Sequence, residues 1–596
     1  MKLPPFCFVS GLVLLAAAPL HAQRDATVER VLELGKSDNR VEEHLEYLTR
    51  TIGPRLTSSS NLTRACEWAR AKFASFGLRA HMEPWGEWPV GFDRHFMRGA
   101  MVAPTRTDFV FTTPSWTPGT SGPTRGRAVL EPLTAAEADA LAAEPAVWLV
   151  RRARNEGPKG DEKKAIDAKL ADLPLLGEVR GTGDLVITSG NQNITWDKLP
   201  TRVKVTLRKD QHVDLLQRLT EGQPVELEFD LDQRFVRGPI ALYNVWADLV
   251  GSEKPDEFVI VGGHIDSWDG AQGAQDNGTG VSTTLEAARL LSAAGAKPRR
   301  TIRFMLWSGE EQGLLGSEAW VKSHMELMPK ISAVLVHDAG TNYLSGLAGP
   351  PALMADLKWA TTPLFDLDAR FPFNVRENKG LSAFGASDHA SFTAQGVPGL
   401  FWAQDGETSY DYVHHTQHDT FENARQDYQR HSSIVAAVTA YNLASLDHML
   451  DRTGLLQEGG GRRDLTRRFM GVQLEDTTVT SVNAGGIAET AGWKEGDVVL
   501  SIDGVEVATR RDISTEINKG GPRKLIKLKR AGQTIESVLD YTGTPSEEAR
   551  AKAAAKAELE KAAGAASGAP GAPAATGAPA APAAPTVPAN APSSGG

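Results

Sequence analysis

Five short segments of the sequence combine histidine with aspartate or glutamate in patterns that could bind metal ions. They read GHIDSWD at 263–269, QDNG at 275–278, SGEEQG at 308–313, VHDAG at 336–340 and VHHTQHD at 413–419. Each segment alone is weak evidence, because a histidine after a strand is usually structural and a Glu-Glu pair usually begins a solvated helix. Imidazole and carboxylate ligands suit zinc, and hydrolytic metal pairs lie about 3.5–4 Å apart. Five segments in one region therefore predict a metal site.

Three of the five segments directly follow short apolar runs that read as β-strands. These runs lie at 258–261, 301–307 and 331–336, and a helical pattern at 281–293 separates the first two. Strands that alternate with helices predict an α/β fold with a mostly parallel sheet flanked by helices. Such sheets bind ligands at the carboxyl ends of their strands, which is where these segments stand.

Several of these words resemble a known enzyme family. Residues 264–269, 310–313, 387–392 (SDHASF) and 414–416 (HHT) are similar, in the same order, to the co-catalytic di-zinc peptidases of metallopeptidase family 28. The resemblance covers about residues 26–450. It implies the zinc-peptidase fold, two Zn²⁺ ions as cofactors, and an exopeptidase that hydrolyses dipeptides or short peptides.

The resemblance also implies a set of five metal ligands. Asp276 would bridge the two zinc ions. His264 and Asp338 would complete one metal position, and Glu311 and His415 the other. A shared carboxylate that holds two cations together, each with an open position for water, agrees with this division.

Two acidic residues would act on the chemistry without binding metal directly. The resemblance implies that Glu310 is the general base, which takes a proton from a metal-activated water and passes it to the leaving amine. Asp266 would orient the imidazole of His264 as a neighbouring partner. The alternative for Asp266 is an aspartate that only forms a turn.

The remaining polar residues of these words have less specific interpretations. Ser387, Asp388 and His389 are candidates for a substrate pocket, and a hydrogen-bonded loop brace is the alternative. His414 is adjacent to the family ligand position, which falls on His415. His337 is interpreted as structural.

The N-terminus has the three parts of a secretory signal: Lys2, an apolar run at 6–18, and a small residue, Ala22, before a cleavage point. The apolar run is shorter than the about 20 residues that a membrane span needs. We therefore expect an exported protein, periplasmic or secreted by a bacterium, without a transmembrane segment in the mature chain. Of the two cysteines, Cys7 lies in the signal, and Cys66 lies in an expected helix and is interpreted as a packing residue.

Outside the catalytic region, composition and pattern change along the chain. Helices are expected at 26–35, 40–51, 62–76 and 425–450, and alternating runs at 184–188 and 202–207 suggest an inserted β-rich, protease-associated-like domain. That insert either covers the active site or packs passively. The Ala/Pro-rich end is expected to be disordered after a charged helix at 546–563. The predicted boundaries are 1–22 for the signal, 23–98 for an N-terminal helical part of the catalytic domain, 99–238 for the insert, 239–452 for the catalytic domain, 462–543 for a PDZ domain and 546–596 for the tail.

The segment at 492–504 (GWKEGDVVLSIDG) resembles the central part of PDZ domains. Upstream, Phe469, Met470, Gly471 and Val472 resemble the loop whose backbone N–H groups hold a C-terminal carboxylate, followed by a strand edge for β-augmentation. A C-terminal peptide is the expected ligand. The alternative is a PDZ shape that only packs on the catalytic domain.

Charge and motif content restrict the function. A net charge of −10 without a basic cluster argues against a nucleic-acid partner. The partners expected are short peptide substrates, and the resemblance adds a homodimer. Two alternatives to the zinc exopeptidase stay open: a catalytically silent PDZ-type binding protein, and an aminoacyl cyclase on the same fold that uses one zinc. Whether the amino or the carboxyl end of a peptide is trimmed also stays open.

Overall fold

The structure is a computed structural model that describes residues 25–144, 146–153, 156–190, 194–457, 468, 470–482, 486–544 and 547. These residues fall into two compact units, one ending by residue 457 and one beginning at residue 468. The predicted signal peptide and nearly all of the predicted tail lie outside the described residues. No helix in the described part of the chain is long and apolar enough to cross a membrane.

The first unit is built on a mostly parallel sheet, as the sequence predicts. Its catalytic part has the strand order β14-β11-β9-β10-β8, in which the first four strands run parallel and β8 pairs antiparallel with β10. The strands are β8 (Glu226–Leu249), β9 (Lys254–His264), β10 (Arg300–Trp307), β11 (Ile331–Val336) and β14 (Gly399–Phe401).

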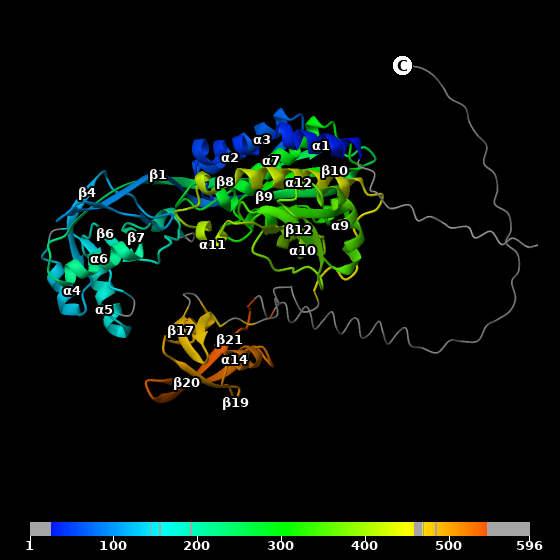
Figure 1. Cartoon of the computed structure of the whole chain (residues 1–596). Helices are drawn as coiled ribbons and strands as arrows, with labels where there is room; N and C mark the ends of the chain where they lie inside the picture. Colours follow the sequence, from blue (N-terminus) through cyan, green and yellow to red (C-terminus); the bar gives the residue numbers. More distant parts are fainter. Residues whose placement is uncertain are drawn as a thin grey trace, which may run out of the picture. The chain divides into compact units, whose positions relative to one another are not determined.

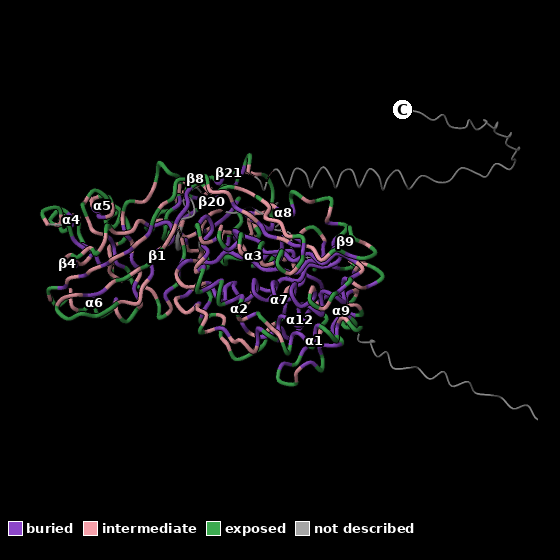
Figure 2. The backbone as a smooth tube through the Cα atoms, turned by 90° about the horizontal axis from the view of Figure 1, so that it is seen from above, coloured by how far each residue is buried: buried purple, intermediate pink, exposed green. Residues whose placement is uncertain are grey.

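Helices cover both faces of this sheet, because its strands are apolar on both sides. Val259 and Val261 of β9 pack into one core, whereas Phe258 and Ile260 pack into another on the opposite face. The purple segments in Figure 2 mark this buried interior. Helices on the first side are α1 (Ala26–Ser37), α3 (Ser60–Ser75), α7 (Thr279–Ala293), α9 (Met354–Thr361) and α12 (Gln426–Ser445), with α2 (Val41–Glu46) against α7; α8 (Leu315–Ser323) and α10 (His389–Thr393) lie on the second.

A long antiparallel arm joins the catalytic part to the insert (Figure 1). It consists of β1 (Arg79–Ala103) paired along its length with β8. The first residues of β8 also pair with β4 (Thr124–Leu130) of the insert, and its last residues pair with β10. The expectation of a helical part up to residue 98 is therefore wrong from Arg79 onward, because pairing with a strand more than 100 residues away decides the conformation there.

The insert is rich in strands, as predicted, and also contains helices. Strands β4, β5 (Trp148–Val150), β6 (Gly177–Gly181) and β7 (Val203–Leu207) are parallel, and β3 (Phe111–Thr112) pairs with β7. Its helices are α4 (Ala135–Leu141), α5 (Gly160–Ala171) and α6 (Lys209–Thr220). The strand expected at 184–188 is not formed. That segment makes an isolated bridge between Ile187 and Thr416 instead.

Smaller elements complete the first unit. A three-stranded sheet contains β12 (Tyr343–Gly349), β13 (Asn374–Glu377) and β15 (Ala403–Asp405), and β2 (Thr107–Asp108) pairs with β1. The short helices are η1 (Tyr47–Ile52), η2 (Trp196–Lys198), η3 (Ala274–Gly278), η4 (Met325–Lys330), η5 (Pro351–Leu353), η6 (Thr362–Leu364), α11 (Tyr410–Val413) and η7 (Phe421–Asn423).

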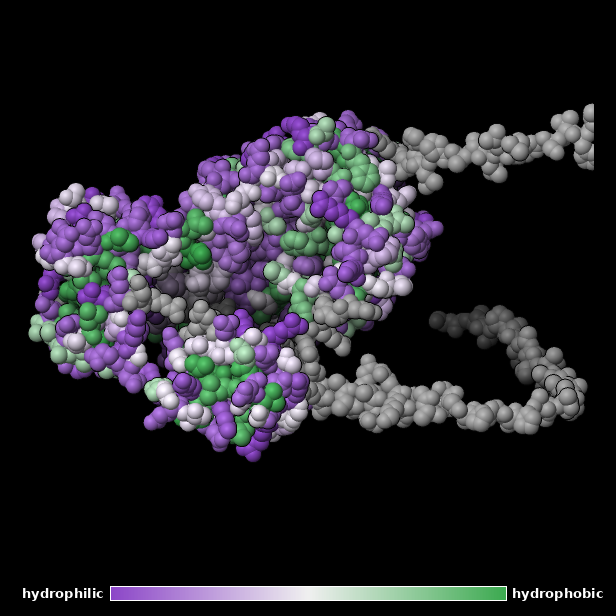
Figure 3. Space-filling view, turned by 60° about the horizontal axis from the view of Figure 1, so that its bottom comes forward, coloured by the Kyte–Doolittle hydropathy of each residue, from purple (hydrophilic) through white to green (hydrophobic). Residues whose placement is uncertain are grey.

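The second unit is a small sheet with two helices. Its strand order is β16-β17-β18-β20-β21, with β19 paired to β18. A hydrophobic core forms inside it, and apolar side chains also gather on the face of this unit seen in Figure 3. The elements are β16 (Val472–Glu475), β17 (Thr478–Val482), α13 (Ile487–Thr490), β18 (Val498–Ile502), β19 (Val505–Glu506), α14 (Arg510–Ile517), β20 (Arg523–Arg530) and β21 (Gln533–Asp540).

Candidate metal centre

The carboxyl ends of three parallel strands bring the predicted site residues to one edge of the sheet. His264 is the last residue of β9 and lies beside Trp307, the last residue of β10. The Glu310-Glu311 pair follows β10, and Asp338 follows β11. Parallel neighbours end at the same edge, so the side chains after them converge.

Asp276 lies between two imidazoles and presents one carboxylate oxygen to each. Its Oδ1 is 3.2 Å from Nε2 of His264, and its Oδ2 is 3.1 Å from Nε2 of His415. Asp276 belongs to η3 and is almost completely buried. This geometry suits a carboxylate shared by two cations.

His264 is surrounded by further acceptors. Its Nε2 is 3.1 Å from Oδ1 of Asp338 and 3.9 Å from Oε2 of Glu310. Its Nδ1 is 3.1 Å from the main-chain oxygen of Asp266, closer than the 3.6 Å to the Asp266 carboxylate. A carbonyl that accepts from Nδ1–H leaves Nε2 free to bind a cation.

The Asp266 carboxylate braces the loop after β10 more directly than it orients the imidazole. Its two oxygens accept hydrogen bonds from the main-chain N–H groups of Glu310 (3.3 Å) and Glu311 (3.2 Å), and Thr57 donates a third. The structure therefore places Asp266 as a support for both glutamates. In turn, Oε2 of Glu311 is 2.9 Å from Nε2 of His415.

The electrostatics of the cluster show an excess of negative charge. Burial would raise the pKa of Asp276, but hydrogen bonds to His264 and His415 hold it well below its usual range. Burial raises the pKa of Glu311 to about 7, and the charge of Asp276 adds to the shift. Burial also raises the pKa of Glu310. For His415, burial would lower the pKa, but Asp276 and Glu311 raise it to about 10.

The donor set fits divalent metal ions of the zinc type. Two groups of three side chains each offer nitrogen or oxygen atoms within 4.8 Å of one another: His264, Asp276 and Asp338 form one group, and Asp276, His414 and His415 form the other. Asp276 is common to both. Buried carboxylates that raise the pKa of their neighbours are a costly arrangement without a compensating cation.

Arg55 is a buried part of this region that the sequence reading missed. Its guanidinium is fully buried and donates to the main-chain oxygens of Ile265 (2.7 Å), Gln272 (3.1 Å) and Gly273 (2.7 Å). It thereby ties both ends of the loop between His264 and η3. Burial lowers the pKa of Arg55 to about 10. No local pattern around Arg55 predicts this role, since these three carbonyl partners lie more than 200 residues away.

Two further side chains adjoin the cluster. His414 is 44% exposed, and its Nε2 lies 3.7 Å from Oδ2 of Asp276, whereas the Nε2 of His415 lies 3.1 Å from the same oxygen. Tyr410 packs against the ring of His414 with centroids 4.9 Å apart. Burial, with Asp276 as a secondary cause, raises the pKa of Tyr410 well above its usual value. Both lie on or next to α11, which leads into His415.

The other candidate residues are placed as follows. Ser387 and Asp388 are buried just before α10, and their side-chain oxygens have no solvent exposure. Burial raises the pKa of Asp388 to about 7 and lowers that of His389 to about 4. A direct pocket role for these residues stays a prediction. His337 is buried, with its Nε2 3.3 Å from the amide nitrogen of Gln404.

In the second unit, the predicted carboxylate loop is described except for Phe469, which lies outside the described residues. Gly471 has φ +77°, and a Cβ there would lie 2.9 Å from Cα of Gly486, so the position requires glycine. Met470 precedes it, and Val472 begins β16, which is an edge strand of the sheet. An edge strand after a glycine loop has the backbone groups that β-augmentation uses.

Comparison with known proteins agrees with both parts of the chain. Residues 244–439 match the model of peptidase family M28, and residues 478–530 match that of the PDZ domain. Carboxypeptidase Q from Rattus norvegicus is 28% identical, and the human protein 27%, each over 70% of this chain and 88% of its own length. An aminopeptidase from Pseudomonas aeruginosa is 30% identical over 43% of this chain and 51% of its own length.

A solved structure supports the fold. The crystal structure of a peptidase M28 precursor from Shewanella amazonensis aligns with a TM-score of 0.52 and 24% identity, covering 71% of this chain and 97% of that one. The M28 match includes all the residues gathered at the candidate metal centre: His264, Asp266, Asp276, Glu310, Glu311, Asp338 and His415. The PDZ match spans most of the described second unit. The chain therefore contains a peptidase family M28 domain and a PDZ domain.

Proposed function

We propose that the protein is a zinc-dependent exopeptidase that hydrolyses dipeptides or short peptides with two metal ions. The observation that carries the proposal is the Asp276 carboxylate, which presents one oxygen to His264 and the other to His415. A side chain in this position can be shared by two cations. The relatives named carboxypeptidase Q and aminopeptidase support exopeptidase activity.

The two metal positions would divide the remaining ligands. His264 and Asp338 would hold one zinc with Asp276, and Glu311 and His415 would hold the other, since these pairs lie within 3.1 Å and 2.9 Å. When bound, zinc lowers the pKa of a water molecule toward about 7 and polarises the carbonyl that is attacked.

Glu310 is positioned to move the proton. Its carboxylate lies on the same side of the cluster as His264, 3.9 Å from Nε2, and its main chain is fixed by the Asp266 carboxylate. Glu310 takes a proton from the attacking water and returns it to the amine that leaves. Burial and acidic neighbours raise the pKa of Glu310 in the metal-free protein, and two bound cations would oppose this shift and favour the ionised carboxylate that accepts the proton.

A peptide panel tests the activity and decides which end is trimmed. Dipeptides and tripeptides with free ends, with acetylated amino ends or with amidated carboxyl ends are incubated with the protein, with and without a chelator. Cleavage that requires a free carboxyl end indicates a carboxypeptidase, and cleavage that requires a free amino end indicates an aminopeptidase. Cleavage that persists in the presence of the chelator would contradict the proposal. An absence of cleavage after zinc is restored would contradict it as well.

Two other functions predict different results in the same experiment. A catalytically silent PDZ-type binding protein would cleave none of these peptides. The presence of Glu310 and of all five ligand positions argues against this function. An aminoacyl cyclase releases cyclised products and typically holds one zinc. Metal analysis separates this case, because the shared position of Asp276 favours two ions per chain.

We further propose that the PDZ unit binds a peptide carboxylate at Met470, Gly471 and Val472. The positive φ of Gly471 and the edge position of β16 support this role. Calorimetric titration with peptides that have free or amidated carboxyl ends tests it, since amidation should abolish binding. Equal affinity for both forms would favour the alternative of passive packing.

Export and self-association complete the proposal. The signal pattern at residues 1–22 supports export, and N-terminal sequencing of protein from the bacterial periplasm or medium should begin at Gln23. Sedimentation would show whether the mature chain forms the homodimer that the family resemblance implies.

A further inference from the structure

The arm and the insert touch the candidate metal centre at two separate points, which we call the insert junction. The first point is a salt bridge between Arg94 on β1 and Asp269 in the loop after β9. The second is the segment 186–189, which lies against the loop that carries His415. Both contacts reach the same half of the centre.

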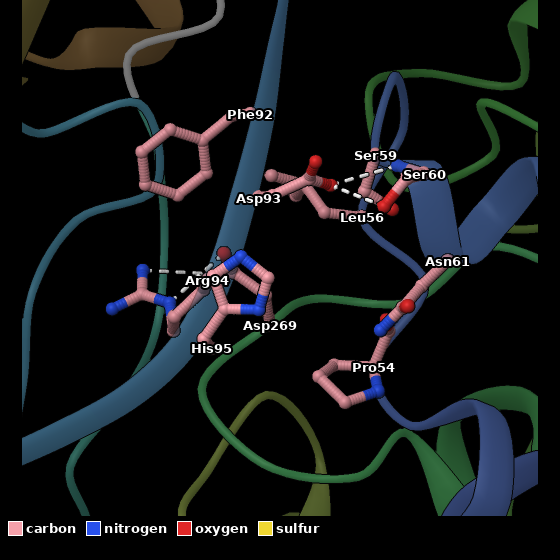
Figure 4. A pocket seen from close by; sticks show the side chains of 10 residues that line it. All are labelled: Pro54, Leu56, Ser59, Ser60, Asn61, Phe92, Asp93, Arg94, His95 and Asp269. Atoms are coloured by element: carbon pink, nitrogen blue, oxygen red, sulfur yellow. Dashed lines mark hydrogen bonds and ion pairs between the residues drawn. The ribbon is translucent and has the colours of Figure 1, made fainter. Parts of the chain in front are cut away.

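The first contact is a buried ion pair with three hydrogen bonds. Arg94 donates to Asp269 from Nε (2.9 Å) and from Nη2 (3.2 Å), and both side chains are only 4% exposed. The hydroxyl of Ser115 in the insert donates to the same carboxylate at 2.5 Å. Figure 4 shows Arg94 and Asp269 in direct contact among the residues that line a pocket. Arg94 is held in turn by the hydroxyl and main-chain oxygen of Thr113.

Asp269 anchors the residue that supports one metal position. Its neighbour Trp268 donates its main-chain N–H to Oε1 of Glu311 at 3.2 Å. The Trp268 ring lies edge-on to the ring of His415, with centroids 6.1 Å apart. The ion pair with Arg94 thus fixes a residue that contacts both Glu311 and His415.

The second contact acts on His415 through its main chain. The N–H of Thr188 donates to the carbonyl oxygen of His415 at 2.8 Å, and the N–H of Val186 donates to the side-chain oxygen of Gln417 at 2.7 Å. His415 has φ +59°, a left-handed conformation that costs free energy for a non-glycine residue unless its surroundings hold it. The insert therefore supplies part of the restraint that keeps His415 in this conformation.

The two contacts are also packed against each other. A Cβ at Gly270 would lie 1.6 Å from the hydroxyl oxygen of Thr188, so the loop after β9 and the insert segment fit closely only because this residue is glycine. The Thr188 hydroxyl lies 3.2 Å from that of Thr112 in β3. The insert segment cannot shift without disturbing the loop that carries Asp269.

The other metal position is supported differently. The contacts of His264 run to Asp266, Asp276, Glu310 and Asp338, all within the catalytic part. The Asp266 carboxylate is held by the loop after β10 and by Thr57. The insert junction thus bears on the Glu311–His415 position, whereas the described contacts of His264 belong to the catalytic part.

We propose that the insert junction sets the affinity of one of the two metal positions, the one formed by Glu311 and His415. Arg94, Ser115 and Thr188 are positioning residues, which act through Trp268 and the main chain of His415. This inference rests on the two-metal centre proposed above. It replaces the two simpler roles of the insert, a cover or a passive packing domain, by a specific one.

Zinc titration of the full chain tests the proposal with Arg94→Gln. Metal-free protein is titrated against a competing chromophoric chelator, which resolves two binding steps. Partners beyond the direct ligands typically change metal affinity by about 10–100-fold. We expect the dissociation constant of one of the two steps to rise by about that factor while the other step changes by less than about threefold. Activity should return at high zinc concentration.

The matched control is Arg125→Gln. Arg125 belongs to β4 of the insert and pairs with Glu226 of β8, where both side chains are more than 40% exposed. Its loss also removes an arginine–carboxylate pair from the insert, so a shift of metal affinity in this variant would show that any damage to the insert has this effect. Both binding steps should match those of the unchanged protein.

A second variant keeps the test decisive if Arg94→Gln folds poorly. Gly270→Ala forces the Thr188 segment and the loop apart without removing a charge, and it should weaken the same single step. Equal weakening of both steps, or no change in either variant, overturns the proposal. If the unchanged protein itself binds one zinc or none, the two-metal function fails before the junction is tested, so the two failures are distinguishable.

Discussion

Replacement of Glu310 by glutamine should lower turnover without lowering the stability of the metal-free protein. The side chain is 10% exposed, and glutamine has almost the same size and shape, so packing is preserved. The main-chain N–H of residue 310 still donates to Asp266. What changes is one proton-accepting group, and general acid–base catalysis contributes about 10²–10⁴-fold. Turnover should fall by that factor, or about 2.7–5.4 kcal/mol at 1.36 kcal/mol per decade.

The same substitution should stabilise the metal-free protein. Burial and the neighbouring charges of Asp338, Asp388 and Glu311 raise the pKa of Glu310, which means that its ionised form is unfavourable in the folded state. A neutral amide removes this repulsion. The unfolding temperature of the metal-free variant should therefore equal or exceed that of the unchanged protein.

The assay combines turnover of the best dipeptide, zinc content and thermal unfolding. The control is Glu318→Gln, an exposed glutamate of α8 that should change none of the three. Near-normal turnover in Glu310→Gln would refute its role as general base. Loss of bound zinc would instead make Glu310 a ligand, and a lower unfolding temperature of the metal-free variant would refute the electrostatic reasoning.

Three further predictions follow from other buried charges. Asp276→Ala should lower zinc content at both positions, as measured by metal analysis after gel filtration, and two tightly held ions would exclude a bridging role. Arg55→Met should destabilise the catalytic part by about 3 kcal/mol or more in urea unfolding, because three or more buried carbonyls lose their donor; a change below 1 kcal/mol would contradict this. For Glu178, burial raises the pKa but Arg151 lowers it more, to about 2, so its contribution to stability is complete above about pH 4.5 and is lost as the pH falls toward 2. The stability difference between Glu178→Gln and the unchanged protein should shrink over that interval, and a constant difference would refute the assignment.

The sequence predicted the catalytic sheet well, because its strands are short, apolar and locally bounded. The runs at 258–261, 301–307 and 331–336 lie within β9, β10 and β11, and the helix at 281–293 lies within α7. Since parallel strands end at one edge, the position of three polar segments after these strands was enough to predict that they meet. The structure brings His264, Asp276 and Asp338 together at that edge.

The arm could not be predicted from local pattern. β1 and β8 are 25 and 24 residues long and contain register shifts, so their alternation is broken by irregular pairs. The paired residues of β1 and β8 are more than 100 positions apart in the sequence, and strand propensity without the partner is a weak signal. The segment at 184–188 has the alternating pattern of a strand. In the structure it contacts the loop that carries His415 and does not join a sheet.

Arg55 and Arg94 were missed because their function depends on distant atoms. Each is an arginine in an ordinary sequence context, and only folding shows that one donates to three carbonyls of the loop after β9 and the other pairs with Asp269 in the same loop. Both guanidinium groups bind the segment of chain that leads from His264 to Asp276. A charged ligand loop is thus held by fixed arginines from two separate regions of the chain.

The division of these supports has a physical consequence for the whole unit. A cluster of buried carboxylates is unfavourable without cations, so metal binding contributes directly to the folding free energy of the part that carries the ligands. β8 belongs both to the insert and to the catalytic sheet, and Asp269 joins the two again at Arg94. In the arrangement that we propose, binding at the Glu311–His415 position stabilises the insert junction, so by linkage a change that loosens this junction, rather than the insert elsewhere, weakens binding at that position.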